Sequence, residues 1–386
     1  MHEDGGKVWP WRLGGVGECY TFFQSTRLRN GMKKRIKVFL GGDVNETQAQ
    51  CLNCRALALH LDREKFVVGA RTVYSGDLDD APIAKLPNTK LFKVRYPAKI
   101  WVPLQLIRGI IWSDVVYWTS PGYWKLARFL CKILGKKSFG TIEGVYTGIA
   151  KERALACFGS KEALQKFHSF TTKTFAITKA MIAKNRELVG LKEPDGVLYL
   201  GTDYEKFAAE KTSEKLTDAI IIGADLKRKG IDDYLVLAKR FPQIKFHVAG
   251  GAVGGVDYER QCKESGLKNV VFHGPVSHDK LKEILKDVQL HIFPSRAEGF
   301  PKVTLETAAA GVPSLVYDDY GANEWIESGK NGFVVKTVDE MIEVVQSLLN
   351  KPELLQPLAD NARELAKKFD WETLVKDWER EIERIV

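Results

Sequence analysis

Residues 291–311 read HIFPSRAEGFPKVTLETAAAG, and this stretch decides the fold class. The mostly apolar run at 288–293 is short enough for a buried strand. Pro294 and Gly299 interrupt it, and Pro301 suits the first position of a helix, where its missing N–H needs no partner. The small residues that follow continue a close-packed helix until a glycine stops it. We therefore predict a buried strand, a tight loop and a helix in this order.

The start of this predicted helix bears on function. Its first backbone N–H groups lack partners within the helix, and the helix dipole is positive there, so a phosphate would be stabilised at this end. Glu298 and Glu306 flank the same end. Carboxylates repel a phosphate, so if a phosphate binds we expect these two to accept hydrogen bonds from hydroxyl groups of a sugar or a ribose. A capped core helix with one solvated Glu is the alternative interpretation.

The segment EGFPKVTLE resembles the E-x7-E donor-site motif of retaining glycosyltransferases of family 4, which have the GT-B fold. The preceding PS at 294–295 and the AAAGVP run at 308–313 are similar to that family too. The resemblance implies an α/β protein with two Rossmann-like, doubly wound parallel sheets that face a central cleft. It also implies that the donor is bound by residues of the motif, namely Glu298, Gly299, Phe300, Pro301, Lys302, Val303 and Glu306.

The length of 386 residues suits two domains. We expect an acceptor-side domain at 36–195 and a nucleotide-sugar-binding domain at 196–368. The resemblance implies that a terminal helix, 369–386, packs back on the first domain. Residues 1–35 are rich in Gly, Trp and Arg and lack periodicity, so we expect a disordered leader or an extension upstream of a start at Met32.

Strand-like and helix-like segments alternate along the first half, which predicts a parallel sheet. A first strand at 36–40 ends in Gly41 and Gly42, and a helix is expected at roughly 47–62. In the resembled family this glycine loop faces the donor diphosphate, which makes both glycines candidate donor contacts. Further strands of this half are expected at 65–70, 91–95, 114–119, 138–142 and 172–178.

The stretch KSFGTIEGVYTG, at 137–148, closes a strand at the carboxyl edge of the first sheet, where ligands bind in open α/β folds. Many relatives have a His at about the position of Glu143, whereas this chain has no His between His60 and His168. We expect Glu143 to replace it and to accept the proton of an acceptor hydroxyl. The alternative is a Glu on a surface loop.

The second half contains GADLKRKG at 223–230. Members of the resembled family usually have Gly-Arg here, then Lys-Gly five residues later, and the Arg and Lys together neutralise the diphosphate. Lys229 matches this pattern, but Ala224 stands in place of the Arg. Lys227 and Arg228 are the candidates to compensate for the missing charge.

Strands of the second half are expected at 196–200, 219–223, 245–249, 270–272, 288–293, 312–318 and 331–335. His273 and Gly274 follow one of these strands. In relatives the corresponding loop lies near the nucleotide base, so both residues are candidate donor contacts. A purely structural His is the alternative.

Positive charge is concentrated in segment 92–137, which has nine Lys or Arg and a single acidic residue, while the whole chain has a net charge of +9. Basic residues lie beside a helical face formed by Trp124, Ala127, Leu130, Cys131 and Leu134, which suits an anionic membrane surface. A buried face with solvated lysines is the alternative, and we expect no nucleic-acid partner. The scattered cysteines favour a reducing cytoplasm, with peripheral contact at the inner face of the membrane.

The resemblance implies a hexosyltransferase that moves a sugar, with retention, from a UDP or GDP sugar to a glycan or lipid-linked acceptor in polysaccharide biosynthesis. It implies neither a metal nor a cofactor, so charge on the leaving diphosphate would be met by Lys229, the glycine loops and the helix start. Two alternatives remain on sequence alone. One is a sugar-nucleotide epimerase on the same fold, and the other is a non-catalytic nucleotide-sugar binder.

Overall fold

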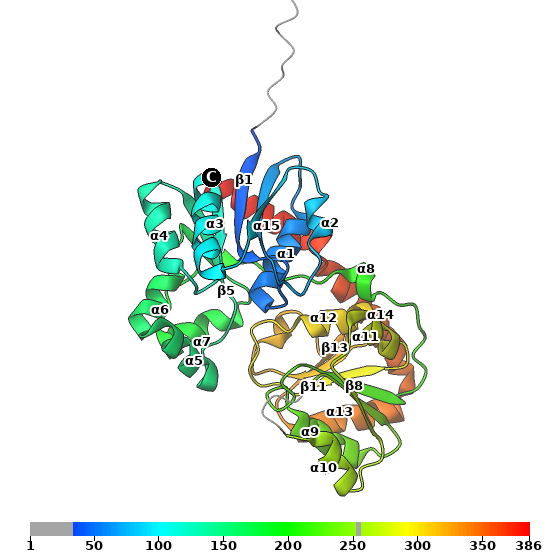
Figure 1. Ribbon diagram of the computed structural model, residues 1–386. Helices are drawn as coiled ribbons and strands as arrows, with labels where there is room; N and C mark the ends of the chain where they lie inside the picture. Colours follow the sequence, from blue (N-terminus) through cyan, green and yellow to red (C-terminus); the bar gives the residue numbers. More distant parts are fainter. Residues whose placement is uncertain (1–33, 252–255) are drawn as a thin grey trace, which may run out of the picture. The chain divides into compact units, whose positions relative to one another are not determined.

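The structure is a computed structural model that describes residues 34–251 and 256–386 (Figure 1). Apart from its last two residues, the leader expected at 1–35 lies outside the described residues. Within them the strands form two parallel sheets, one of seven strands and one of six. The prediction of two doubly wound α/β sheets is therefore confirmed.

The first sheet has the order β3-β2-β1-β4-β5-β6-β7, and every neighbouring pair is parallel. The chain order reverses between β1 and β4, and ligands of such sheets bind beyond the carboxyl ends of the strands at that point. The strands are β1 (Ile36–Asp43), β2 (Phe66–Val73), β3 (Thr89–Val94), β4 (Val115–Trp118), β5 (Lys137–Ile142), β6 (Lys173–Ala176) and β7 (Gly196–Val197). The helices between them are α1 (Ala49–His60), α2 (Ala81–Ala84), α3 (Ala98–Trp112), α4 (Trp124–Ile133), α5 (Gly148–Phe158), α6 (Lys161–His168) and α7 (Ala180–Val189).

The second sheet has the order β10-β9-β8-β11-β12-β13 and reverses between β8 and β11. Its strands are β8 (Asp218–Ile222), β9 (Lys245–Ala249), β10 (Val270–Gly274), β11 (Leu290–Phe293), β12 (Ser314–Tyr317) and β13 (Gly332–Val335). The helices are α8 (Tyr204–Phe207), α9 (Ile231–Arg240), α10 (Tyr258–Glu264), α11 (His278–Leu285), α12 (Lys302–Ala309), α13 (Val338–Asn350), α14 (Leu355–Lys368) and α15 (Trp371–Ile385). Two 3-10 turns, η1 (Ala322–Glu324) and η2 (Pro352–Leu354), complete this half.

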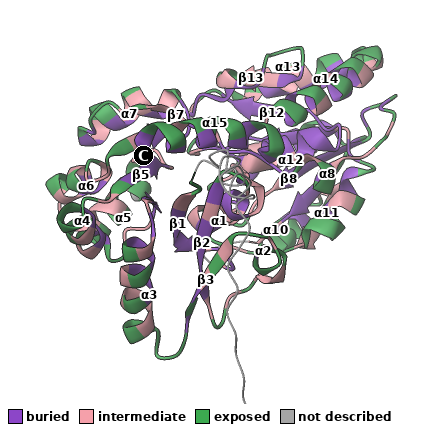
Figure 2. Cartoon of the chain, turned by 90° about the horizontal axis from the view of Figure 1, so that it is seen from above, coloured by how far each residue is buried: buried purple, intermediate pink, exposed green. Residues whose placement is uncertain are grey.

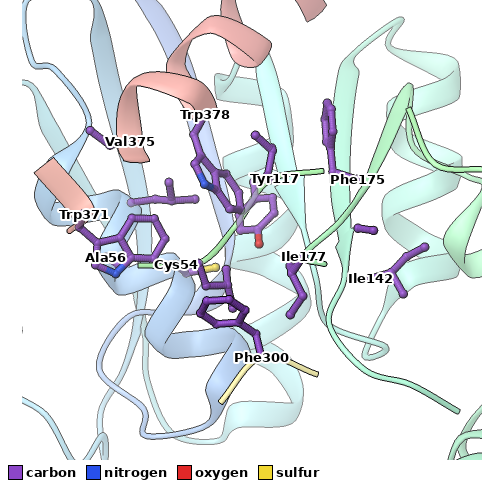
Figure 3. Close-up of a cluster of buried hydrophobic side chains, with 14 of the residues drawn as sticks. Cys54, Ala56, Tyr117, Ile142, Phe175, Ile177, Phe300, Trp371, Val375 and Trp378 are labelled. Atoms are coloured by element: carbon purple, nitrogen blue, oxygen red, sulfur yellow. The ribbon is translucent and has the colours of Figure 1, made fainter. Parts of the chain in front are cut away.

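The last helix, α15, packs on the first sheet although it follows the second in the chain. The side chain of Trp378 in this helix is fully buried, and its ring centroid lies 5.6 Å from that of Tyr117 (Figure 3). The ring centroid of Phe139 lies 6.5 Å away. The indole Nε1 donates a hydrogen bond to the Tyr199 carbonyl oxygen at 3.1 Å. Because a buried Trp needs a partner for its N–H, this bond fixes how the helix returns to the sheet.

The prediction that Gly41 and Gly42 form a loop after β1 is wrong. Gly41 and Gly42 are buried inside β1, which continues to Asp43. A Cβ at Gly42 would lie 2.9 Å from the Cys54 sulfur, and one at Gly41 would lie 3.0 Å from the Tyr117 carbonyl oxygen. These glycines therefore allow close packing of α1 and β4 on the strand, and they do not form a loop that could cradle a phosphate.

The prediction that the Trp124 face of α4 contacts a membrane is also wrong. Trp124, Ala127 and Cys131 are buried in a core cluster with Phe39 and Leu106. The opposite side of α4 faces outward (Figure 2). It carries five exposed residues, namely Lys125, Arg128, Phe129, Lys132 and Ile133. In residues 34–251 and 256–386, none of the helices is both long and apolar enough to cross a bilayer.

Candidate active site

The strand, loop and helix predicted at 288–311 are present as β11, a loop and α12. The helix begins at Lys302, one residue later than predicted, and Pro301 is its N-cap. The hydroxyl of Thr304 donates to the Pro301 carbonyl oxygen at 2.9 Å. One side of α12 is buried, and it packs against α14. The loop is therefore held between a central strand and a buried helix.

The carboxylate of Glu298 in this loop receives three hydrogen bonds on one oxygen, Oε1. The donors are Lys229 Nζ at 2.8 Å, Arg228 Nη1 at 2.8 Å and Ser295 Oγ at 2.6 Å. The Glu298 side chain is 9% exposed and that of Lys229 12%, so this ion pair is largely shielded from water. Burial lowers the pKa of the Lys229 amine, while the adjacent Glu298 carboxylate opposes this shift.

The turn between β8 and α9 brings the lysine to this place. Gly230, the N-cap of α9, has φ +83° and approaches the Pro294 carbonyl so closely that a Cβ would lie 2.1 Å from its oxygen. A side chain at this position would therefore separate the two loops. The aliphatic part of Lys229 passes over Gly223, and its ammonium group lies 4.8 Å from the centre of the Phe293 ring.

The other two charged residues of the motif lie on the first turns of α12. Lys302 Nζ donates to Asn53 Oδ1 of α1 at 2.6 Å, and burial lowers the pKa of its amine. Glu306 is half-buried one turn later. Burial raises the pKa of the Glu306 carboxyl, and the positive charge of Lys302 partly offsets this. Thus α12 places a cation and a carboxylate beside each other at its start.

Glu143 follows β5 and lines a pocket of about 340 Å³. Its Oε1 accepts hydrogen bonds from the hydroxyls of Thr141 at 2.7 Å and Tyr117 at 3.3 Å. Its Oε2 is buried and has no hydrogen-bond partner among the residues that the structure describes. Burial raises the pKa of this carboxyl. A buried carboxylate oxygen without a partner is an available proton acceptor.

The backbone of Glu143 touches the loop that carries Glu298. A Cβ at Gly299 would lie 2.2 Å from the Glu143 carbonyl oxygen, so only glycine permits this approach. Tyr146, Phe158 and Phe167 are among the residues that line the same pocket as Glu143. The structure therefore brings together Glu143 and the loop of Glu298, which are more than 150 residues apart in the sequence.

Residues 203–365, which contain this loop, match the family model described as Glycosyl transferases group 1. This match covers less than half of the chain. Among curated relatives, alpha-galactosylglucosyldiacylglycerol synthase of Streptococcus pneumoniae is 30% identical over 166 residues, which cover 41% of this chain and 44% of that protein. Alpha-D-kanosaminyltransferase of Streptomyces kanamyceticus is 33% identical over 193 residues, covering 49% of this chain and 45% of that protein. The matched part is less than half of each relative.

Solved structures agree over a larger part of the chain. HepE of Anabaena in complex with UDP has a TM-score of 0.72 at 16% identity, and the match covers 90% of this chain and 100% of that one. The lipopolysaccharide outer core galactosyltransferase WaaB, in its apo form, has a TM-score of 0.66 at 16% identity, with 91% and 99% covered. The predicted GT-B fold is thereby confirmed.

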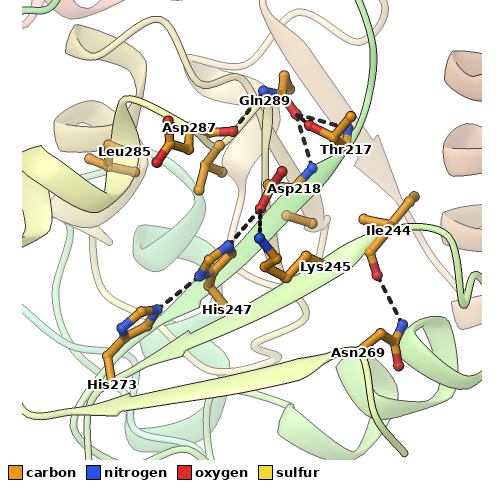
Figure 4. Close-up of polar contacts among 12 residues, drawn as sticks. Thr217, Asp218, Ile244, Lys245, His247, Asn269, His273, Leu285, Asp287 and Gln289 are labelled. Carbon is orange, nitrogen blue, oxygen red and sulfur yellow. Dashed lines mark hydrogen bonds and ion pairs between the residues drawn. The ribbon is translucent and has the colours of Figure 1, made fainter.

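Outside the loop and α12, one further predicted donor contact has a different environment from the one expected. His273 Nε2 and His247 Nδ1 are 2.8 Å apart, and the two rings are stacked with centroids 5.1 Å apart (Figure 4). His247 Nε2 in turn lies 2.8 Å from Asp218 Oδ1. His273 is thus engaged in a polar chain across three strands, which agrees with the structural alternative. Gly274, with φ +65°, ends β10 beside it.

Sequence reasoning gave no role to Ser295 and Asn53, which the structure places at these contacts, or to Glu324. It named Arg228 only as a candidate to compensate for Ala224. Glu324 accepts hydrogen bonds from the backbone N–H groups of Lys179 and Ala180, at 2.8 and 2.5 Å, and from the Tyr199 hydroxyl at 2.9 Å. A carboxylate at the start of α7 satisfies N–H groups that have no partner within the helix. The sequence signal for Arg228 was its place beside Lys229, but the direction of its side chain could not be derived.

Proposed function

We propose that this protein transfers a sugar from a nucleoside diphosphate sugar to an acceptor hydroxyl, with retention of configuration and without a metal ion. The observation that carries the proposal is the cluster in which Lys229 and Arg228 meet Glu298 in front of α12. This cluster lies within the part that matches the glycosyltransferase family. The UDP bound by HepE supports a nucleoside diphosphate as the leaving group.

The roles follow from charge. The leaving diphosphate gains negative charge as the glycosidic bond breaks, and Lys229 with backbone N–H groups at the start of α12 would stabilise it. Glu298 would accept hydrogen bonds from hydroxyls of the donor sugar. Glu306, a half-buried carboxylate on the same helix, would bind the ribose hydroxyls.

The acceptor would occupy the pocket beside Glu143. Its hydroxyl oxygen forms the new bond to the anomeric carbon, the bond from that carbon to the diphosphate breaks, and Glu143 Oε2 takes the hydroxyl proton. The raised pKa of Glu143 makes it a stronger base than an exposed carboxylate. A pocket lined both by aromatic side chains and by hydroxyl and carboxyl groups suits a glycan, which has both apolar faces and polar edges.

A screen of UDP and GDP sugars by thermal shift, followed by transfer assays with glycan and lipid-linked acceptors, tests the proposal. A bound ligand at 100 times its Kd should stabilise the protein by roughly 2.7 kcal/mol. Product formation that requires both donor and acceptor would support transfer. Conversion of the nucleotide sugar alone would instead show an epimerase, and donor binding without turnover would leave a non-catalytic binder.

We further propose that the enzyme works at an anionic membrane surface. The α3–α4 surface consists of the exposed apolar residues Ile100, Leu104, Ile111, Phe129 and Ile133 and the exposed basic residues Lys99, Arg108, Lys125, Arg128 and Lys132. In the described part of the chain none of these cations forms an ion pair, whereas many basic side chains on the second half pair with an acid. Exposed apolar side chains between unpaired cations are typical of an interfacial contact.

The two helices of this surface are joined at their ends. Lys136, just after α4, donates from Nζ to the carbonyl oxygens of Ile111 at 3.0 Å and Ser113 at 2.5 Å, both at the end of α3. Ile111 is 56% exposed and Ile133 58%. The name of the Streptococcus pneumoniae relative includes a diacylglycerol, which supports a lipid-linked acceptor at the membrane.

A further inference from the structure

Three consecutive cations in the turn before α9 contact two different partners. Lys227 forms an exposed ion pair with Asp232. Arg228 and Lys229 both reach the same oxygen of Glu298, each at 2.8 Å. Two of three adjacent positive charges are thus directed to the loop in front of α12, and the third is directed to the surface.

Position 224 in the same turn cannot supply a charge. Ala224 is exposed and ends at its Cβ, although the resembled motif has an Arg there. The guanidinium group of Arg228 instead reaches Glu298 and also donates from Nη1 to the Ala297 carbonyl oxygen at 3.0 Å. The cation lost at one end of the turn is therefore present at its other end.

The guanidinium group retains capacity for a ligand. The Arg228 side chain is 45% exposed, and its Nε lies 3.8 Å from Asp225, the other acid beside it. Within the described part of the chain, its Nη2 makes no hydrogen bond to the protein. A guanidinium group presents donors in a planar fork that matches two oxygens of a phosphate. Arg228 can therefore turn to an anion without first breaking all of its present contacts.

We propose that Arg228 is the second diphosphate-binding cation of this enzyme and that it takes the place of the arginine absent at position 224. This inference rests on the proposed function of the site. In the structure the carboxylate of Glu298 binds both cations in front of α12. When the donor binds, its phosphate oxygens take over the cations, and the Glu298 carboxylate becomes available to the hydroxyls of the donor sugar.

The test is calorimetric titration of UDP, GDP and uridine against wild type, Arg228→Ala, Arg228→Lys and the matched control Lys227→Ala. Loss of a hydrogen bond to a charged group changes affinity about tenfold to a hundredfold. We expect this loss for the nucleoside diphosphate with Arg228→Ala, a smaller loss with Arg228→Lys, and wild-type affinity with Lys227→Ala. The affinity for uridine should not change, because it has no phosphate.

The double variant Ala224→Arg/Arg228→Ala returns the cation to the position of the family motif. It should recover part of the lost affinity, which a purely structural role of Arg228 would not predict. If wild type binds the nucleoside diphosphate and the Arg228→Ala and Lys227→Ala variants bind it with equal affinity, the role assigned to Arg228 is wrong. The proposed function would not be affected by that result. If wild type binds neither UDP nor GDP, the proposed function fails and this inference fails with it.

Discussion

Lys302 Nζ lies 2.6 Å from Asn53 Oδ1. The first residue of α12, in the second half, therefore contacts α1, a helix that lies between strands of the first sheet. This contact places a positive charge close to Glu143. Burial raises the pKa of the Glu143 carboxyl, and the charge of Lys302 is one of the contributions that oppose this rise. The residue that starts the donor-side helix thus influences the carboxyl group that we assign to the acceptor. Lys302 was predicted only as a donor contact, and no pattern in the sequence links it to Asn53.

The pH dependence of transfer should respond to this charge. Glu143 acts as a base only when ionised, so activity falls as the pH drops through its raised pKa. Lys302→Met removes the positive charge that favours the ionised form, and the acidic limb of kcat/KM should therefore move to higher pH. Lys302→Arg keeps the charge and should leave the limb near its wild-type position. Identical acidic limbs for Lys302→Met and wild type would show that the charge of Lys302 does not influence the ionisation of Glu143.

Glu298 and Glu306 should differ when each is replaced. Glu306→Gln should weaken binding of the nucleoside and of the nucleoside diphosphate, by about tenfold to a hundredfold, because a ribose contact to a charged group is lost. Glu298→Gln should preserve or strengthen binding of the nucleoside diphosphate, because Lys229 is released from its carboxylate, and should lower kcat. Titration of nucleoside, nucleoside diphosphate and donor against both variants measures this. Matching affinity changes for the two variants would show that the carboxylates have no separate roles.

Local patterns predicted the strands and the loop before α12 because their signals are local, namely short apolar runs bounded by Gly and Pro. The side of α4 that is buried could not be predicted in this way. It is set by packing against residues such as Phe39, which lies far from α4 in the sequence. The same limit applies to Gly42. Its lack of a side chain leaves room for Cys54, and this depends on how α1 packs on β1.

Vesicle binding should depend on both components of the α3–α4 surface. The triple variant Lys125→Glu/Arg128→Glu/Lys132→Glu should lose binding to anionic vesicles, and wild-type binding should weaken as salt screens charges beyond about 10 Å at 0.1 M. The matched control reverses three exposed lysines of the second half and so makes the same change in net charge, with the substitutions Lys239→Glu, Lys263→Glu and Lys286→Glu.

The apolar component is tested separately. Phe129→Ser/Ile133→Ser should weaken the binding that remains at high salt, because two exposed side chains no longer enter the interface. Co-sedimentation with neutral and anionic vesicles measures both effects. Equal losses in the α4 triple variant and the control would indicate a response to net charge alone, and this surface would then have no special role.

His291 of β11 should make folding stability depend on pH. Its side chain is completely buried, and burial lowers its pKa to about 3, with the charge of Lys229 as a smaller contribution. In the unfolded chain a His has a pKa of about 6.5. Between these values the unfolded state binds a proton that the folded state excludes. Stability from the neutral His291 is therefore complete above about pH 6.5 and is lost as the pH falls towards 3, at up to about 1.4 kcal/mol per pH unit.

Urea unfolding of wild type and His291→Asn at pH 7.5, 6.5, 5.5 and 4.5 measures this dependence. The variant loses the contact of His291 Nδ1 with Ser314 Oγ, 2.9 Å away, so it should be less stable at pH 7.5. It also lacks the titrating group, so its free energy of unfolding should fall less steeply on acidification, and the two curves should converge. If the two curves stay parallel from pH 7.5 to 4.5, His291 does not contribute to the pH dependence of stability. It would then be protonated in the folded protein despite its burial, or another group would compensate for its effect.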